Sequence, residues 1–136
     1  MKYLLNADVC IALINGTSTK ARGRFVQAVR SGATLATSTI VVHQLWHRAA
    51  KNELATRYAR TLATFLSRDV AVLDYSEQDS RAAGEIRTEL ERRGQRIGEY
   101  DTLIAGQAFS RNLILVTANT REFGRIKGLI VEDWSV

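Results

Sequence analysis

Short apolar segments alternate along this chain with longer segments whose apolar residues recur every three or four positions. The first kind has the length of a buried strand and the second the period of an amphipathic helix. Strands separated by helices are expected to run parallel, because a parallel pair needs a long crossover. The sequence therefore predicts an α/β fold, a parallel sheet of about four to five strands flanked by helices in an α/β/α sandwich. The expected strands are 2–5, 33–37, 70–73, 113–116 and 129–131.

Turn and capping residues mark the ends of several expected helices. A helix over 20–30 should stop at Gly32, and Ser38 or Thr39 can cap the next one. The segment 76–79 resembles a capping box, which opens a helix ending near Gly94. The segment 98–101 leads into an apolar helix over 102–109. Helical spacing in the middle of the chain predicts two buried faces, Val42, Leu45, Trp46 and Ala49 on the first and Leu54, Tyr58, Leu62 and Phe65 on the second.

The length and composition are those of one globular domain. A chain of 136 residues, 46% apolar and 24% charged, can bury one core but hardly two, so we expect a single domain over 1–136. The first residues form no export signal and no apolar run is long enough to cross a bilayer. The only cysteine, Cys10, cannot form an internal disulfide and is expected to be a small buried residue. These features predict a cytoplasmic protein that does not bind a membrane.

Positive charge exceeds negative charge in the sequence. Nineteen Lys and Arg against fourteen Asp and Glu give a net charge of +5, which favours an anionic partner, with nucleic acid first. A modest excess also aids solubility, so charge alone leaves both interpretations open. RNA binding through these residues should weaken steeply with salt. The candidate contributors are Lys20, Arg22, Arg24, Arg92, Arg93 and Arg96.

Polar residues follow the expected strands at their carboxyl ends, where ligands of open parallel sheets bind. Asn6 and Asp8 follow the first strand. Asp101 lies at a helix N-terminus between strands, and its side chain could join them. If extended geometry persists to residue 8, Asn6 and Asp8 face the same side, about 7 Å apart. Carboxylate and amide oxygens suit Mg²⁺ or Mn²⁺, although helix capping is an alternative interpretation of Asp8 and Asp101. The other residues that this rule selects are Ser38, Gln44 and 117–122.

His43 and His47 have the spacing of the two histidines in the H-E-x-x-H zinc motif. Gln44 stands where that motif has its glutamate base, and no third ligand is apparent. A zinc site at His43 and His47 is therefore the weaker metal hypothesis. The alternative is two polar helix residues beside a Trp46 that packs inward.

Short segments spread over nearly the whole chain carry a family resemblance. They are YLL (3–5), VCI (9–11), STI (38–40), GEIRTEL (84–90), IGEYDTLIA (97–105), VTANTREF (116–123) and VEDW (131–134). Through them the chain resembles the PIN-domain VapC toxins of bacterial toxin–antitoxin pairs from end to end. The resemblance implies a Mg²⁺-dependent endoribonuclease that cleaves tRNA or another structured RNA, is held inactive by a VapB-type antitoxin and forms a homodimer. In such an enzyme the carboxylates hold metal and activate water.

The resemblance also implies a catalytic set, which this chain carries incompletely. Asp101 matches a family aspartate, and Asn119 matches a position that is Asn or Asp. Asn6 stands where the family has its first aspartate, and Gln44 where it has a glutamate. The implied catalytic residues are thus Asp101, Asn6, Gln44 and Asn119, with Asn6 and Asp101 as metal ligands and Asp8 as a further candidate.

Each amide keeps the shape of a carboxylate but removes its negative charge, so Mg²⁺ affinity and general-base activation of water should both fall. We therefore expect reduced nuclease activity. Glu122, Glu99 and Asp8 could supply compensating charge. The alternative is a non-catalytic PIN domain that still binds antitoxin or RNA.

Overall fold

The computed structural model describes residues 1–51 and 55–136. The strands in these residues form one parallel sheet of five, in the order β3-β2-β1-β4-β5. The predicted α/β fold and parallel sheet are confirmed. The strands are β1 Lys2–Leu5, β2 Thr34–Ser38, β3 Ala71–Leu73, β4 Ile114–Val116 and β5 Val131–Glu132.

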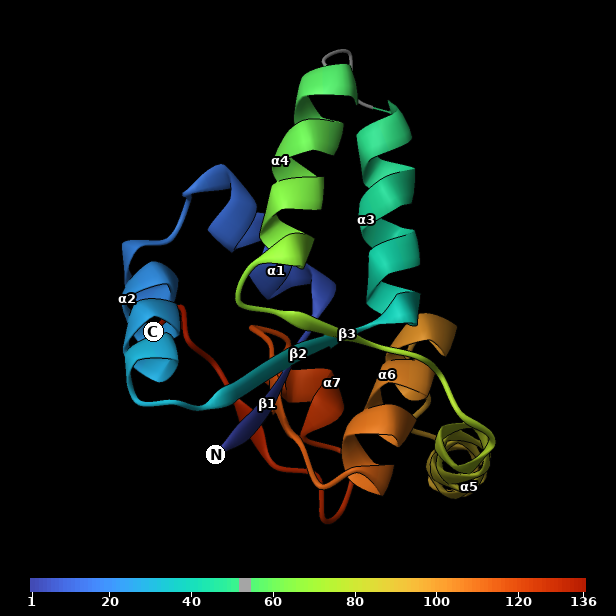
Figure 1. Cartoon of the computed structure of the whole chain (residues 1–136). Helices are drawn as coiled ribbons and strands as arrows, with labels where there is room; N and C mark the ends of the chain where they lie inside the picture. The colour runs from blue at the N-terminus through green and yellow to red at the C-terminus, as the bar shows by residue number, and fades with distance from the viewer. Residues whose placement is uncertain (52–54) are drawn as a thin grey trace.

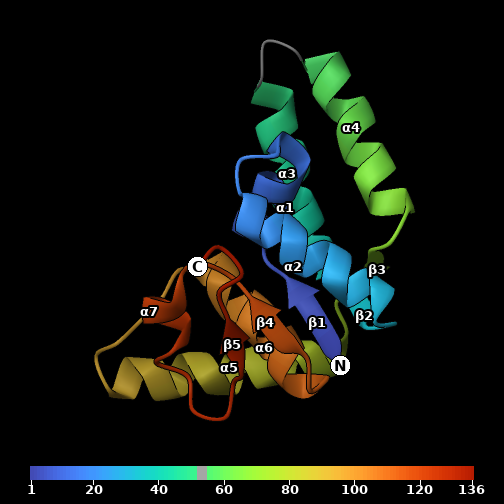
Figure 2. The ribbon, with the colours of Figure 1, turned by 90° about the vertical axis from the view of Figure 1, so that its left-hand side faces the viewer.

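Helices cover both faces of this sheet. Figure 2 shows α1 to α4 on one side of the strands and α5 and α6 on the other. The chain moves from β1 through β2 to β3 and then returns to β4, so right-handed crossovers place the later helices on the opposite face. The helices are α1 Ala7–Asn15, α2 Thr19–Arg30, α3 Thr39–Lys51, α4 Ala55–Ser67, α5 Glu77–Arg92, α6 Glu99–Ser110 and α7 Thr120–Phe123 (Figure 1).

The strand order reverses between β1 and β4, which lie side by side at the centre of the sheet. Leu5 pairs with Val116 at the carboxyl end of both strands. The Asn6 N–H then donates to the Val116 carbonyl at 3.0 Å, and the Thr117 N–H donates to the Glu132 carbonyl at 3.0 Å. The residues that follow β1 and β4 are thereby held together at the point where open sheets bind ligands.

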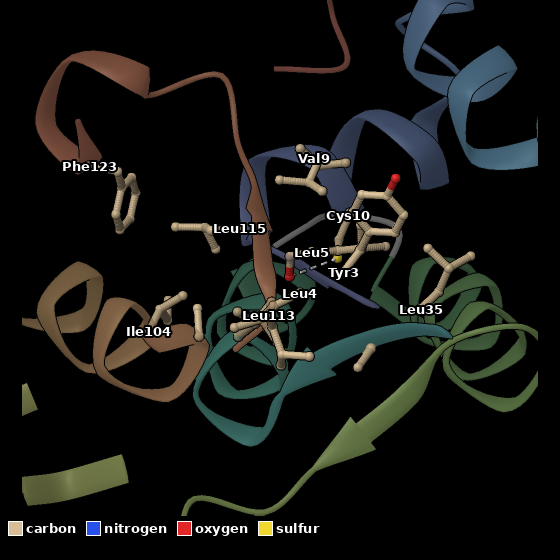
Figure 3. Packing of buried hydrophobic residues seen from close by; sticks show 14 of the residues in the cluster. Tyr3, Leu4, Leu5, Val9, Cys10, Leu35, Ile104, Leu113, Leu115 and Phe123 are labelled. Carbon is tan, nitrogen blue, oxygen red and sulfur yellow. Dashed lines mark hydrogen bonds between the residues drawn. The ribbon is translucent and has the colours of Figure 1, made fainter. Parts of the chain in front are cut away.

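The core lies around the two central strands. Leu4, Leu5 and Leu115 are fully buried, and Ile104 of α6 packs into the same cluster (Figure 3). Cys10 is also fully buried, as predicted, with its Sγ directed at the Leu5 carbonyl. Burial raises the pKa of the Cys10 thiol to about 12. This residue therefore acts as a core residue, and the tight core holds the ends of β1 and β4 in place.

Several predicted helix ends are confirmed. Ser76 accepts from the Asp79 N–H and Asp79 accepts from the Ser76 N–H, which completes a capping box. Ser38 Oγ accepts from the Ile40 N–H at the start of α3. Gly32 and Gly94 follow α2 and α5 with φ of 77° and 64°, values that favour glycine. These helix ends could be predicted from sequence because each depends on a capping side chain or on a glycine near the end of the helix.

Other expectations were wrong in detail. Trp46 was predicted to be buried but is 42% exposed. The buried residues of α3 are Val41, Leu45 and Ala49, which recur every four positions, so Trp46, one residue after Leu45, faces solvent. The last strand is Val131–Glu132 rather than 129–131. Leu62 is buried as predicted, whereas Leu54 lies outside the described residues.

The helix predicted over 102–109 begins three residues earlier, at Glu99, so Asp101 lies within its first turn. Gly98 takes the N-cap position of this helix without a side chain to mark it. Within the described residues, no helix has the length and apolar composition needed to cross a membrane.

Candidate active site

Asn6 is the first polar residue after β1 and the N-cap of α1. It is only 6% exposed, and its Nδ2 donates to Thr117 Oγ1 at 3.3 Å. Its Oδ1 is buried and has no hydrogen-bond partner among the residues that the structure describes. A buried oxygen without a donor is costly unless a further group satisfies it. Asn6 therefore offers an unused ligand oxygen at the end of the sheet.

Asp8 lies in the first turn of α1, because β1 already ends at Leu5. The expectation that strand geometry persists to residue 8 is wrong, since α1 begins at Ala7. Asp8 Oδ1 accepts from the adjacent Val9 N–H at 2.9 Å, which partly agrees with the capping interpretation. Its Oδ2 accepts from Thr117 Oγ1 at 3.0 Å and from the Ala118 N–H at 2.8 Å. The carboxylate thus connects α1 to the loop after β4.

Thr117 joins these groups, and the catalytic set predicted from sequence lacks it. Its side chain is buried, donates to Asp8 and accepts from both Asn6 and the Asn119 N–H, the last at 3.1 Å. Threonine is not among the usual metal ligands or general bases in proteins, so its residue type did not mark it. Its position directly after β4 was the feature of the sequence that could have identified it.

Asn119 and Glu122 form the next part of the site, on and before α7. Asn119 Nδ2 donates to Glu122 Oε2 at 3.1 Å, which orients the Glu122 carboxylate. Both side chains are partly buried. The short helix α7 was not predicted. The sequence indicates that Glu122 follows the fourth strand but does not show its link to Asn119.

Asp101 projects from the first turn of α6, which lies on the opposite face of the sheet from α1. Burial raises the pKa of its carboxyl, and the negative charges of Glu122 and then Asp8 raise it further. Three carboxylates from α1, α6 and α7 therefore lie close enough to interact. Their mutual repulsion is what a bound cation would relieve.

Gln44 lies on α3, and its Oε1 is buried without a hydrogen-bond partner among the described residues. No hydrogen bond in the described part of the chain connects it to Asn6 or Thr117. Its helix packs against α6, and the preceding His43 contacts Tyr100 beside Asp101. The structure therefore brings Asn6, Asp8 and Asn119 together through Thr117 and places Gln44 on a neighbouring element.

The two histidines of the zinc hypothesis lie on the exposed face of α3. His43 Nε2 is 3.4 Å from the Tyr100 hydroxyl, and the His43 and His47 ring centroids are 6.5 Å apart. Over residues 1–51 and 55–136, no group of three or more His, Cys, Asp or Glu side chains is placed to hold a metal ion. The zinc hypothesis therefore gains no third ligand.

Several of the basic residues considered for RNA binding have acidic neighbours. Arg24 pairs with Glu132 at 3.0 Å and lies 5.6 Å from the centre of the Trp134 ring. Arg93 lies 3.5 Å from Glu89, and Arg96 lies 3.9 Å from Glu91. These arginines therefore form ion pairs with glutamates of the same chain, which accounts for part of the basic surface without a nucleic-acid partner.

The side chains at the sheet end have the oxygen chemistry that a hard divalent cation prefers, but Asp8, Asp101 and Glu122 do not form a three-ligand metal site in the described residues. Asp8, Asp101 and Glu122 supply carboxylate oxygens, and Asn6 Oδ1 supplies an unused amide oxygen. Mg²⁺ and Mn²⁺ take such oxygens and keep several waters. The mixture of amides and carboxylates should bind more weakly than an all-carboxylate site, because each amide lacks a negative charge.

Comparison with known proteins identifies the family of the chain. The model of the PIN domain matches residues 3–129. The tRNA(fMet)-specific endonuclease VapC of Shigella flexneri is 38% identical over 135 residues, covering 99% of both chains. The chain belongs to the PIN-domain VapC family. Ribonuclease VapC2 of Rickettsia felis is 36% identical to this VapC-family chain over 134 residues, 98% of each.

Solved structures of VapC relatives share the fold. The crystal structure of VapBC2 from Rickettsia felis bound to a promoter DNA fragment superposes with a TM-score of 0.92 at 35% identity, covering 98% of this chain and 99% of that one. The DNA-bound VapBC of Salmonella typhimurium gives 0.90 at 39% identity, covering 98% of each chain. The PIN fold of this VapC-family chain therefore extends over nearly its whole length.

Proposed function

We propose that this VapC-family protein is the toxin of a type II toxin–antitoxin pair and a Mg²⁺-dependent endoribonuclease that cleaves tRNA or another structured RNA. The observation that carries the proposal is the hydrogen-bonded group of Asn6, Thr117, Asp8, Asn119 and Glu122 at the strand switch point. The charges of Glu122 and Asp8 also contribute to the raised pKa of Asp101. The Shigella flexneri relative, a tRNA(fMet)-specific endonuclease, supports the choice of RNA.

Asp101, Asp8 and Asn6 Oδ1 would hold the ion. When bound, Mg²⁺ (or Mn²⁺) would supply charge neutralisation at the phosphodiester and a hydroxide near neutral pH. Burial and the charges of Glu122 and Asp8 raise the pKa of the Asp101 carboxyl, and a bound cation would relieve this repulsion. Asn119 holds Glu122 in position, and Thr117 holds Asp8 and Asn6.

We propose further that this chain is a weak nuclease. Asn6 and Gln44 each place a buried amide oxygen, without a hydrogen-bond partner in the described residues, where a carboxylate would add charge. The same two amides favour the second candidate function, a PIN domain that binds antitoxin or RNA without cutting. The carboxylates of Asp8 and Glu122 favour the enzyme, since they partly replace the missing charge.

The proposed partners are a VapB-type antitoxin and a second copy of the chain. The VapBC complexes of Rickettsia felis and Salmonella typhimurium support the first, because those VapC chains resemble this one over 98% of its length. A complex with the antitoxin would suppress the nuclease.

Cleavage of a tRNA pool in Mg²⁺, in Mn²⁺ and in EDTA tests the proposal. We expect slow cleavage with either metal, none in EDTA and none from an Asp101→Asn variant. Asp69→Asn, an exposed residue before β3, is the matched control and should cleave like the parent. RNA binding without metal-dependent cleavage would support the non-catalytic alternative instead.

A further inference from the structure

Three flat rings lie in a row on the surface where α3 meets α6. Tyr100 and His43 have ring centroids 5.7 Å apart, and His43 and His47 follow at 6.5 Å with planes only 7° from parallel. The Tyr100 hydroxyl is 3.4 Å from His43 Nε2. All three side chains are exposed, Tyr100 by 48%. We call Tyr100, His43 and His47 the ring row.

The core does not account for this arrangement. α3 buries Val41, Leu45 and Ala49, while His43 and His47 occupy a separate stripe of the same four-residue period. Exposed rings arranged face to face are suited to a flat ligand, since planar groups stack with about 3.5 Å between contacting atoms. A base held between two parallel rings needs them about 7 Å apart. The 6.5 Å spacing of His43 and His47 is close to this value.

Positive charge continues the same stripe. Lys51 lies four residues after His47, one helical turn further along α3, and is exposed. Arg48 is exposed beside it. A row of rings followed by a cation fits a nucleotide, whose base stacks and whose phosphate is anionic. An apolar peptide carries no anionic group with which the Lys51 ammonium could pair.

The ring row also adjoins the candidate active site. Tyr100 directly precedes Asp101 on α6, and His43 directly precedes Gln44 on α3. α3 and α6 are in contact at this point, as the ribbon also shows (Figure 1). A base bound here would belong to a nucleotide close to the scissile phosphate.

We propose that the ring row binds an unpaired RNA base, stacked between His43 and His47, with Tyr100 holding His43 in place. The proposal deepens the proposed function, on which it rests for the choice of RNA. It assigns to this face a preference for RNA whose cleavage site lies beside an unstacked base, as in a loop. Lys51 contacts the phosphate chain next to that base.

A fluorescent base tests the proposal without any catalysis. The probe is a five-nucleotide single-stranded oligoribonucleotide of uridines with a central 2-aminopurine, whose fluorescence falls when the base stacks. It is titrated with the full chain in EDTA, so that cleavage cannot interfere. We expect quenching on binding, and a loss of about tenfold in affinity together with loss of the quenching for His47→Leu.

Matched variants separate stacking from other effects. His47→Phe keeps a flat ring and should retain the quenching, whereas Lys51→Gln should weaken binding and its salt dependence but leave the quenching at saturation intact. Phe109→Leu removes a ring of similar exposure, 46%, at the far end of α6 and should change nothing. Circular dichroism checks that each variant is folded.

Equal quenching by the parent and His47→Leu would overturn the proposal. If sedimentation then shows that His47→Leu has lost a dimer, this face is a contact between two copies of the chain. If binding quenches the 2-aminopurine fluorescence but the chain never cleaves RNA, the proposed nuclease is contradicted and the proposed stacking site is still supported.

Discussion

The Asp8 side chain has a structural role and, in the proposed function, a role as a metal ligand. Its carboxylate accepts from Thr117 Oγ1 and from the Ala118 N–H, and these bonds tie α1 to the loop after β4. The sequence predicts that Asp8 lies beside Asn6 only if the extended geometry of the first strand persists to residue 8. The helix begins at Ala7 instead, and the early turn is what directs the carboxylate to Thr117.

Replacing Asp8 by alanine should affect both roles. We expect Asp8→Ala to lower the free energy of unfolding by about 1 kcal/mol, since three donors, the Val9 and Ala118 N–H groups and Thr117 Oγ1, lose their acceptor at a site that water can reach. Residual RNA cleavage should disappear, because one of the remaining carboxylates is gone. Urea unfolding and a tRNA cleavage assay measure the two effects. Asp8→Asn, which keeps one acceptor, should recover most of the stability, and full activity in Asp8→Ala would remove Asp8 from the site.

Asp101 should make stability depend on pH and on metal. Burial, Glu122 and Asp8 raise its pKa above the ordinary 3.8, so the folded chain binds this proton more tightly than the unfolded chain. Its contribution therefore favours folding below pH 3.8 and is lost as pH rises through the raised pKa. At pH 7 we expect Asp101→Asn to have a higher Tm than the parent, and the difference to vanish near pH 3.

Mg²⁺ should relieve the same repulsion. We expect added Mg²⁺ to raise the Tm of the parent chain and to change that of Asp101→Asn much less, because the ion binds the folded state through this carboxylate. Thermal unfolding at several Mg²⁺ concentrations measures the shift, with Asp69→Asn as control. An equal Mg²⁺ shift in all three chains would mean that Asp101 is not a ligand.

At the scale of elements, a buried ion pair joins α5 to the end of α6. Asp79 is 1% exposed and accepts from Arg111 through both oxygens, at 3.2 and 2.9 Å, and also from Ser110. Burial alone would raise the pKa of the Asp79 carboxyl, but the bonds from Arg111, Ser110 and Ser76 outweigh it and hold that pKa well below its usual value. The helix that carries Asp101 is thus fixed at its opposite end.

Breaking this pair should be costly. Asp79→Asn should lower the free energy of unfolding at pH 7 by roughly 3 kcal/mol, because Arg111 then loses its partner. The lowered pKa means that the stabilisation is present above pH 3.8 and is lost as pH falls toward the lowered value. Urea unfolding at pH 7 and pH 3 tests this. A loss that is the same at both values would show that charge plays no part.

The contact between α5 and α6 depends on a glycine. A Cβ at Gly106 would lie 2.6 Å from the Ala83 backbone nitrogen, whereas one at Gly84 would meet nothing within 4 Å. Gly106→Ala should therefore lower the free energy of unfolding by about 1 to 3 kcal/mol, and Gly84→Ala should raise it by about 0.5 to 1 kcal/mol. Chemical denaturation of the pair measures both, and a neutral Gly106→Ala would mean that the two helices can separate without cost.

For the whole molecule, the sheet was predictable because its strands are short apolar runs between helical periods, which require parallel pairing. The carboxyl-end rule likewise found Asn6, Asp8 and the segment after β4. The sequence did not predict the role of Thr117, since it depends on a contact between the residues that follow β1 and β4. It did not predict the helix α7 either, because four residues are too few to show a helical period. The exposure of Trp46 was missed because neighbouring positions on a helix differ in direction by about 100°.

In the proposed function this VapC-family chain has a metal-dependent nuclease site that two amides, Asn6 and Gln44, weaken. The most direct measurement is the initial rate of tRNA cleavage in Mg²⁺ by the parent and by Asn6→Asp with Gln44→Glu. We predict a gain of at least about tenfold, because two charges and one general base are restored. Gln95→Glu with Asn112→Asp adds the same charge at exposed positions and should change little. Equal rates for the parent and the restored chain would contradict the account.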